Sequence, residues 1–560
     1  MAKKKSSAET AESMARKQRE ISVSEFFLKN RHLLGFDNPR KALLTTVKEA
    51  VDNSLDACEE AGILPEISVD IQQIASDRFR VSILDNGPGI VQTQIPKIFG
   101  KLLYGSKFHR LRMSRGQQGI GISAAGMYGQ LTTGSATEIR SKIKGKREAN
   151  LIHVQLDTKA NKPAIVKSEK EEWEPTFYPT KPDGEPGRPV AYKHGTCVAI
   201  EMEAAYIRGK LSVDEFLKQC AIVNPHLQLH YRVGLKKTFN EEVEPAEENE
   251  QPWISFHRGI KELPERVDEI KPHPHGVELG ILIQMLKDST SKTLRAALNN
   301  DFSRVSARAA LEICEQAGLN PKARPTRIAH QESEALYKAI NATKLMRPPT
   351  DCLSPIGEEQ MIAGLKKELQ ADFFTAVTRS PTVYRGNPFQ VEVAMAYAKP
   401  GENQELLADD PARVMRFANR VPLLYMSGAC ATTKAVSGVN WRAYGLTHPK
   451  GALPVGPLVI MVHMASVWVP FTSESKEAIA HYPEIVKELT FALQECGRRL
   501  SIYVKRRKRE AEAERKRSYI VSYIPHLALG LKDILDLKDR QEGQVVDKLN
   551  KMLEKTHLEV

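Results

Sequence analysis

The sequence lacks a long hydrophobic run and contains few cysteines. No uninterrupted apolar stretch approaches the roughly 18 residues that a membrane-spanning helix needs. Residues 1–20 are polar and have no apolar core of the kind found in signal peptides. The 7 cysteines are scattered and never form a CxxC pair, which argues against a structural zinc site or a disulfide framework. We therefore expect a cytoplasmic protein with a disordered leader over residues 1–20.

Acidic residues are also in deficit. The chain has 81 Lys and Arg against 69 Asp and Glu, which gives a net charge of +12 and a pI near 9.1. This balance favours a polyanionic partner such as nucleic acid. A hydrophobic share of 41% and a charged share of 27% are typical of a globular protein. The length of 560 residues suggests about three or four domains.

One expected helix carries an unusual polar stripe. Apolar residues at helical spacing predict a helix within residues 41–62. On it, one face carries Glu49, Asp52, Asn53 and Asp56, at positions i, i+3, i+4 and i+7. A solvated face is the ordinary explanation of such a stripe, but asparagine is a poor choice in mid-helix because it competes for its own backbone. An amide and carboxylates one turn apart could instead bind Mg²⁺, with the glutamate free to deprotonate a water.

Two glycine-rich segments follow this helix. "SILDNGPGI" (residues 82–90) predicts a strand that ends at Asp85, where Gly87 and Gly89 leave room for a flat ligand beside the carboxylate. "GQQGIG" (residues 116–121) offers backbone N–H groups at a helix N-terminus, a common way to hold phosphates. Either segment alone would be explained as a turn or loop. In this order, and together with the polar stripe, they suit three parts of a magnesium–ATP complex.

Two other nucleotide-binding motifs do not fit. "GKLLYGSK" (residues 100–107) is close to a P-loop, but Ser106 precedes Lys107 where that motif needs the lysine first. "GQQGIG" does not follow a strand in a βαβ unit, as a dinucleotide-binding fingerprint should.

The three segments resemble the ATP-binding boxes of the GHKL ATPases, which include gyrase, heat-shock chaperones, MutL proteins and histidine kinases. The resemblance implies an α/β sandwich of the Bergerat type. It also implies that Glu49 is the general base, that Asn53 is the Mg²⁺ ligand and that Asp85 accepts the adenine amino group. "HGTCVAIEM" (residues 194–202) resembles the last box of this family, in which Thr196 would assist Asp85.

The same resemblance implies a further set of ATP-binding residues. Gly87 and Gly89 would lie beside the adenine. The phosphates would be wrapped by Ser106, Lys107, Arg115, Gly116, Gln117, Gln118, Gly119, Ile120, Gly121 and Ile122.

Within this family, the chain resembles the ATPase subunits of type IIB DNA topoisomerases, which are typical of archaea. Long segments carry the likeness, among them residues 101–130 and 419–446. The resemblance implies an α+β multidomain chain with a helical insert, an α/β transducer domain and a long exit helix. Its expected parts are the leader (1–20), a GHKL ATPase domain with an N-terminal strap (21–236), a helix–two-turns–helix domain (237–346), the transducer (347–504) and a basic helix with a partner-docking tail (505–560).

The resemblance also assigns contacts to the phosphate and to DNA. In the family a transducer lysine reaches the γ-phosphate, and Lys434 in "ATTK" is taken as the matching position; an exposed loop lysine is the ordinary alternative. Arg442 in "NWRAYG" matches a DNA-facing element. A basic DNA-binding loop is represented by Arg208 and Lys210, but Leu211 stands where another arginine might stand.

The function implied is that of an ATP-binding and hydrolysing B subunit. ATP would join it to a second B subunit around a DNA segment, with Mg²⁺ as cofactor. No acidic cleavage domain is recognisable, so a separate A subunit would cut the duplex in an A2B2 heterotetramer that relaxes supercoils, decatenates DNA and associates with the nucleoid. The apolar segment 518–531 is a plausible dock for that A subunit. The alternative is a GHKL chaperone or a mismatch-repair-like clamp without strand passage, against which the helical insert and "SPIGEE" (residues 354–359) argue.

Overall fold

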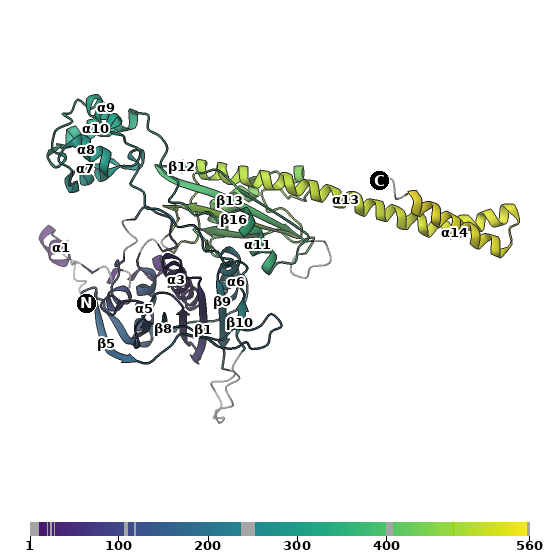
Figure 1. Ribbon diagram of the computed structural model, residues 1–560, viewed down its shortest axis with the longest axis horizontal. Helices are drawn as coiled ribbons and strands as arrows, with labels where there is room; N and C mark the ends of the chain where they lie inside the picture. Colours follow the sequence, from purple (N-terminus) through teal and green to yellow (C-terminus); the bar gives the residue numbers. More distant parts are fainter. Residues whose placement is uncertain are drawn as a thin grey trace, which may run out of the picture.

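The computed structural model describes residues 10–18, 21–22, 25–26, 29–105, 110–116, 119–236, 252–398, 407–473 and 475–556. Two α/β layers lie against each other, a small group of helices stands to one side, and a long helical hairpin projects from the second layer (Figure 1). Within the described residues, no helix combines the length and the apolar character needed to span a bilayer.

The first layer is built on an eight-stranded sheet with the strand order β10-β9-β1-β2-β8-β3-β4-β5. Its strands are β1 (Glu66–Ala75), β2 (Arg78–Asp85), β3 (Thr137–Lys142), β4 (Ala149–Asp157), β5 (Lys162–Glu171), β8 (Gly195–Glu203), β9 (Gln228–Gly234) and β10 (Ile254–Phe256). A separate hairpin is formed by β6 (Thr176–Phe177) and β7 (Val190–Ala191). The sequence predicts that the ATPase domain ends at residue 236. Because β10 pairs with β9, the first layer continues beyond that residue.

Helices cover one face of this sheet, on the side of the second layer (Figure 1). They are α3 (Pro39–Glu60), α5 (Gly121–Thr133) and α6 (Val213–Val223), and the short α4 (Ile95–Phe99) packs near β4 and β5. Helix α3 begins where the Asn38 side chain accepts a hydrogen bond from the backbone N–H of Lys41 at 2.8 Å, with Pro39 in its first turn. Its buried apolar face includes Val47, Val51 and Leu55, so the opposite face remains for the site.

The helical group has its own apolar core, formed by residues of α7 (Leu279–Asp288), α8 (Leu294–Asp301), α9 (Ala307–Gln316) and α10 (His330–Ala342). The side-chain hydroxyls of Thr293 and Ser306 accept backbone N–H bonds at the N-termini of α8 and α9. This segment therefore folds as the helical insert that the sequence predicts.

The second layer contains a sheet with the order β11-β13-β16-β14-β15, with β12 paired to β13. Its strands are β11 (Phe373–Thr378), β12 (Thr382–Tyr384), β13 (Asn387–Tyr397), β14 (Arg413–Ala418), β15 (Val421–Pro422) and β16 (Leu458–Ser466). Alternate residues of the central strands face two different cores. One core contains α12 (Ala431–Gly438) and the first part of α13 (Pro483–Leu535), and the other contains α11 (Glu358–Glu368) and the end of α6.

Contact between α6 and α11 joins the two layers. Ile222 and Val223 of α6 share a core with Met361 and Leu365 of α11. Gly364 permits this approach, because a Cβ there would lie 2.1 Å from the backbone oxygen of Ile222. The first layer and the second sheet therefore meet through backbone-to-backbone packing.

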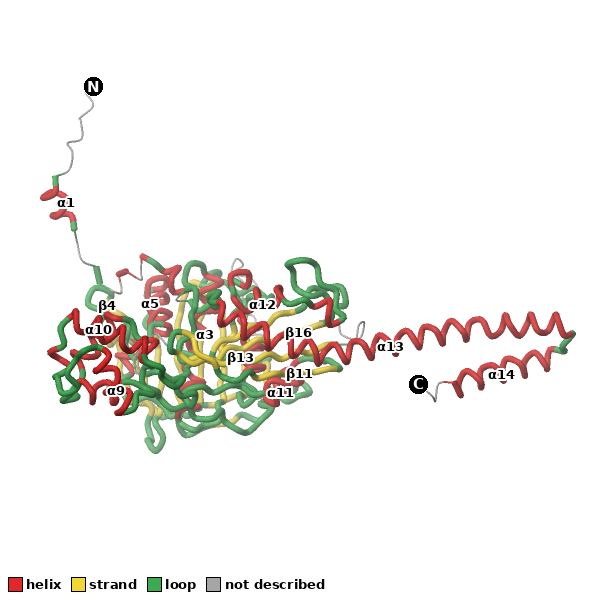
Figure 2. Tube along the Cα trace, turned by 90° about the horizontal axis from the view of Figure 1, so that it is seen from above, coloured by secondary structure: helices red, strands yellow, loops and turns green. Residues whose placement is uncertain are grey.

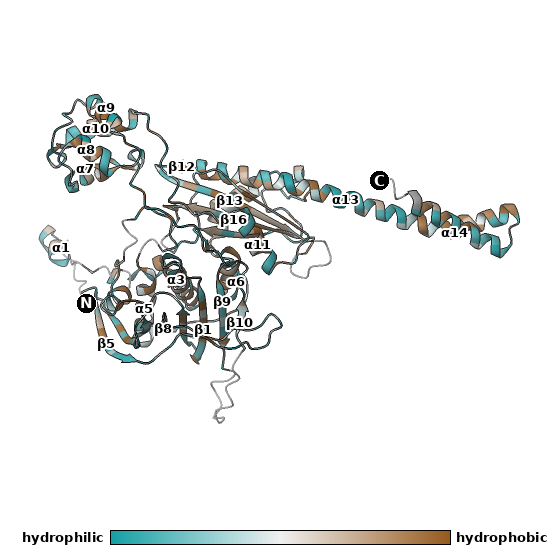
Figure 3. Ribbon diagram, viewed as in Figure 1, coloured by the Kyte–Doolittle hydropathy of each residue, from teal (hydrophilic) through white to brown (hydrophobic). Residues whose placement is uncertain are grey.

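The long helix α13 leaves the second layer after Val504 and is then mostly exposed. Helix α14 (Asp539–Thr556) folds back beside it, as Figure 2 shows. Lys532 near the end of α13 pairs with Asp539 at 2.5 Å and with Glu542 at 2.8 Å. Hydrophobic and hydrophilic residues are mixed along this hairpin (Figure 3), and the expected apolar tail is part of it.

Candidate functional site

A cavity of about 640 Å³ lies between α3, the ends of β2 and β8, and the N-terminus of α5. Its lining residues come from five separate stretches of the chain, within residues 34–60, 83–105, 116–124, 196–198 and 475–476. Ten of the residues expected from the sequence line it: Glu49, Asn53, Asp85, Gly89, Gly116, Gly119, Ile120, Gly121, Ile122 and Thr196. Four others, Ser106, Lys107, Gln117 and Gln118, lie outside the described residues.

Asp85 is a buried carboxylate that lines this cavity. It is the last residue of β2, and it is paired across the sheet with Thr196 of β8. Its Oδ1 accepts hydrogen bonds from the backbone N–H of Gly87 at 2.9 Å and of Thr196 at 3.2 Å, and Oδ2 accepts one from the Ser54 hydroxyl at 2.9 Å. Burial raises the pKa of Asp85 to about 6, although these three donors lower it. A carboxylate held in this way suits a planar ligand that carries an N–H donor.

Glycines let the walls approach closely. Gly87 does not line the cavity, but its N–H orients Asp85. Gly89 has a φ of +78°, and a Cβ there would lie 2.4 Å from the backbone oxygen of Lys142. At Gly121, the first residue of α5, a Cβ would lie 1.8 Å from Oε2 of Glu49. The Glu49 carboxylate therefore rests against the positive end of α5, where an anion is favoured.

Asn53 turns its side chain into the cavity, one turn along α3 from Glu49. An amide oxygen is a hard ligand of the kind that Mg²⁺ accepts, and Mg²⁺ commonly completes its shell with water and substrate phosphates. Asp52, another residue of the predicted polar stripe, does not line the cavity. Its side chain is buried, and neither carboxylate oxygen has a hydrogen-bond partner among the described residues. Burial raises the pKa of Asp52 to about 7.

Two lysines that the sequence reasoning missed also line the cavity. Lys48 precedes Glu49 on α3, and Lys476 comes from the second layer, in the loop before α13. Nζ of Lys48 donates to the backbone oxygen of Ser475 at 3.4 Å, and Nζ of Lys476 donates to that of Arg115 at 3.4 Å. A bridge of 2.6 Å between Lys41 and Glu477 fixes the same loop to α3. The cavity is thus completed by a cation from the second layer.

Comparison with known proteins identifies the family. Residues 38–159 match the family of histidine kinase-, DNA gyrase B- and HSP90-like ATPases, and residues 348–516 match the transducer of the topoisomerase VI B subunit. The type 2 DNA topoisomerase 6 B subunit of Methanococcoides burtonii is 47% identical over 94% of this chain and 79% of its own length. The chain belongs to the topoisomerase VI B subunit family.

Other relatives agree. The same subunit of Methanosarcina mazei is 45% identical over 96% of this chain and 81% of its own, and that of Archaeoglobus fulgidus is 43% identical over 96% and 83%. The comparison with the ATPase region of Saccharomyces cerevisiae topoisomerase II covers 87% of this chain and 100% of that chain, with a TM-score of 0.38 and 9% identity.

The topoisomerase VI B fold corrects the expected position of the transducer lysine. Lys434 is exposed on α12 and does not line the nucleotide cavity. Ala431 and Ala435 face the second-layer core, and Lys434 lies on another side of the same helix. Its side chain therefore points to solvent. Lys476, and not Lys434, is the second-layer lysine that lines the cavity. Its only sequence signal is a lysine in the polar segment "SESKE", between an apolar strand and the long helix.

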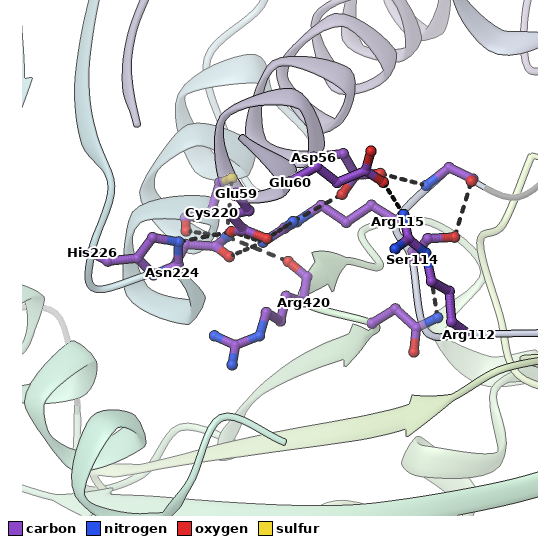
Figure 4. A network of polar contacts seen from close by, with 12 residues as sticks. Asp56, Glu59, Glu60, Arg112, Ser114, Arg115, Cys220, Asn224, His226 and Arg420 are labelled. Atoms are coloured by element: carbon purple, nitrogen blue, oxygen red, sulfur yellow. Dashed lines mark hydrogen bonds and ion pairs between the residues drawn. The ribbon is translucent and has the colours of Figure 1, made fainter. Parts of the chain in front are cut away.

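Arg115 also differs from its expected role. Its guanidinium is buried away from the nucleotide cavity, in the network that Figure 4 shows. Nη1 contacts Glu59 at 2.6 Å and Asp56 at 3.0 Å, and Nη2 contacts Glu59 at 2.7 Å and Asn224 at 2.6 Å. Glu59 also lies 2.8 Å from Nε2 of His226. Although burial opposes it, the guanidinium holds the pKa of Glu59 well below its usual value. The Arg115 guanidinium is therefore paired with carboxylates and does not line the cavity.

The residues expected to contact DNA lie elsewhere on the topoisomerase VI B chain. Arg208 and Lys210 are exposed in the segment between β8 and α6. Arg442 is exposed in the short 3-10 helix Trp441–Tyr444, and its Nε donates to the backbone oxygen of His448 at 2.9 Å. None of the three lines the nucleotide cavity.

Proposed function

We propose that this chain binds and hydrolyses ATP as the B subunit of a type IIB DNA topoisomerase. The observation that carries the proposal is a single cavity shared by both α/β layers. It joins Glu49, Asn53 and Asp85 of the first layer to Lys476 of the second. The relatives that are 43–47% identical over at least 94% of this chain are type 2 DNA topoisomerase 6 B subunits.

The lining suggests how the nucleotide lies. Asp85 would accept the adenine amino group, and Thr196 and Gly87 would hold that carboxylate in place. The N-terminus of α5 and Lys476 would face the phosphates, because both are positive. Asn53 offers its amide oxygen to Mg²⁺, which when bound supplies positive charge to the phosphate oxygens.

Glu49 would act as the general base. Its carboxylate is half-buried beside the first residue of α5, next to the expected γ-phosphate position. It would take a proton from a water molecule as that water attacks the γ-phosphorus, and the bond to the β–γ bridging oxygen would break. Lys476 would offset the negative charge on the transferred group.

Coupling to DNA would follow from the origin of Lys476 in the second layer. While the phosphate is bound, this lysine ties the second layer to the nucleotide, and departure of phosphate removes that tie. We propose that ATP joins two B subunits around a DNA segment and that a separate A subunit cleaves the duplex, in an A2B2 assembly. Exposed Arg208, Lys210 and Arg442 are candidate contacts to DNA phosphates. The N-terminal strap of one protomer would reach the partner protomer. Leu34 and Phe36 line the cavity of the chain to which they belong.

The decisive experiment combines the purified chain with a topoisomerase VI A subunit and supercoiled plasmid. We expect relaxation that requires both subunits, ATP and Mg²⁺. Glu49→Gln is the matched control, because it keeps the size of the side chain but removes the base. It should bind a non-hydrolysable ATP analogue normally and lose turnover by ~10²-fold or more. Relaxation without ATP, or normal turnover of Glu49→Gln, would contradict the proposal.

A further inference from the structure

The turn between β14 and β15 has an unfavourable backbone. Asn419 and Arg420 form a two-residue hairpin loop, and their φ angles are +47° and +64°. Asparagine tolerates this left-handed region, but the second position of such a turn normally carries glycine. A strained residue persists where its surroundings hold it, and strain of this kind is concentrated at functional sites.

The second layer holds this turn firmly. Ser466 at the end of β16 donates its N–H to Oδ1 of Asn419 and accepts a bond from Nδ2, both at 2.9 Å. The backbone N–H of Arg420 donates to Nε2 of His463 at 3.0 Å, and its guanidinium donates to the backbone oxygen of Pro355 at 2.9 Å. The turn is thus a rigid part of the transducer.

The turn reaches into the first layer at residues 113–116, here called the Arg115 segment (Figure 4). Nδ2 of Asn419 also donates to the backbone oxygen of Ser114 at 3.0 Å. The next carbonyl, that of Arg115, accepts the bond from Lys476. Two consecutive carbonyl groups of the first layer are therefore held by two side chains of the transducer.

The other side of the Arg115 segment is bound to the nucleotide-binding layer. The Arg115 side chain is clamped by Glu59 and Asp56 of α3, and the N–H of Gly116 lies 3.4 Å from Oδ2 of Asp56. Gly116 itself lines the nucleotide cavity. A shift of the transducer turn would therefore move a wall of the cavity.

We propose that Asn419 is a positioning residue that holds the phosphate end of the ATP site in register with the transducer. The inference rests on the proposed ATPase function. Lys476 must leave the Arg115 carbonyl in order to reach a phosphate, whereas the Asn419 contact to Ser114 can persist. Asn419 would be the pivot and Lys476 the exchanging contact, so that the orientation of the transducer sets the geometry for hydrolysis.

The test is Asn419→Asp, assayed with the full chain and its A subunit. Aspartate keeps the acceptor for the Ser466 N–H and tolerates the left-handed backbone, but it can donate neither to the backbone oxygen of Ser114 nor to that of Ser466. We expect kcat for ATP to fall about five-fold or more, because the loss of even one of the two hydrogen bonds would account for that factor. KM should change by less than about two-fold, because the adenine end is untouched, and the supercoils removed per ATP hydrolysed should decrease.

Arg420→Gly is the matched control on the same turn. It relieves the left-handed cost and keeps Asn419 and the backbone bond to His463, while it removes only the guanidinium bond to Pro355. We expect kcat and supercoils removed per ATP close to those of the wild type. Thermal unfolding of both variants separates stability from positioning.

Three results would overturn the inference. One is an Asn419→Asp variant with normal kcat and normal supercoils removed per ATP. Another is a variant in which ATP turnover and relaxation fall equally, in proportion to a loss of folded protein. The number of supercoils removed per ATP hydrolysed would then be unchanged. The third is an equal coupling defect in Arg420→Gly. Failure of the wild-type chain to hydrolyse ATP would instead overturn the proposed function, so the two failures are distinguishable.

Discussion

At Gly121 the nucleotide cavity has no room for a side chain. Gly121→Ala would place its Cβ 1.8 Å from the present position of Oε2 of Glu49. Because that oxygen is at the end of a flexible side chain, we expect the variant to fold with Glu49 displaced. Turnover should fall by about 10²-fold, a typical contribution of a positioned general base, while thermal stability changes little. Steady-state ATP hydrolysis and thermal unfolding would measure the two effects.

Gly134 provides the matched control for that substitution. It ends α5 with a φ of +75°, and nothing lies within 4 Å of a Cβ built there. Gly134→Ala should lower stability because of the left-handed backbone and leave ATP turnover nearly intact. Equal losses of turnover in both variants would mean that the close approach of Gly121 to Glu49 is unimportant.

Asp85 links ATP binding to pH. Its pKa is raised to about 6 by burial, so below that pH the free protein holds a proton on the carboxyl group. A bound adenine amino group would favour the ionised form, so binding would release this proton. We expect affinity for a non-hydrolysable ATP analogue to fall as pH decreases through about 6 and to be constant above it. Calorimetric titration over this range tests the effect.

Asp85→Asn is the control for the pH dependence. It keeps one acceptor oxygen but has no titrating group, so it should bind more weakly with a flatter pH profile. A wild-type affinity that is unchanged between about pH 5 and 7 would rule out Asp85 as the adenine acceptor.

At the scale of elements, the loop before α13 is the part of the transducer that lines the nucleotide cavity. Lys476→Ala should lower kcat by about 10²-fold, because a cation facing the transferred phosphate is lost. Lys434→Ala should stay within about two-fold of the wild type, because Lys434 is exposed on α12. Steady-state ATPase assays of the two variants make a direct comparison. The reverse order would restore Lys434 as the phosphate contact.

At the scale of the whole molecule, the α13–α14 hairpin is a surface without an apolar cover in the described chain. Ile534 is 79% exposed and Tyr519 63%. Apolar patches of this kind mark sites of protein association, and we expect the A subunit to bind here. Ile534→Asp should weaken assembly with the A subunit about ten-fold or more, and ATPase activity of the isolated chain should remain. Sedimentation and pull-down of the A subunit would measure the effect.

Ile502 offers a matched control on the same helix. It is 74% exposed, but it lies where α13 still packs on the second sheet. Ile502→Asp should leave assembly intact. If both substitutions weakened assembly with the A subunit equally, the hairpin would not be its binding surface.

The sequence by itself determined the local parts of the site. Helical spacing predicted α3 and brought Glu49 and Asn53 to one face, because positions one turn apart are neighbours on any helix. The pattern of alternating residues predicted a strand that ends at Asp85, and the glycines predicted the start of α5 at Gly121. These features depend on neighbours within a few residues, which the chain order specifies directly.

Only the tertiary structure decided which distant groups meet. Asp52 belongs to the predicted stripe, yet packing buries it, because a set that spans i to i+7 covers a wide arc of the helix. Arg115 pairs with Glu59 and Asp56 in a buried network that also includes Asn224 at the end of α6, and only the fold brings these three segments together. Lys476 reaches the ATP cavity across more than 400 positions of sequence, since contact between the two layers, which no local spacing encodes, brings its loop onto α3.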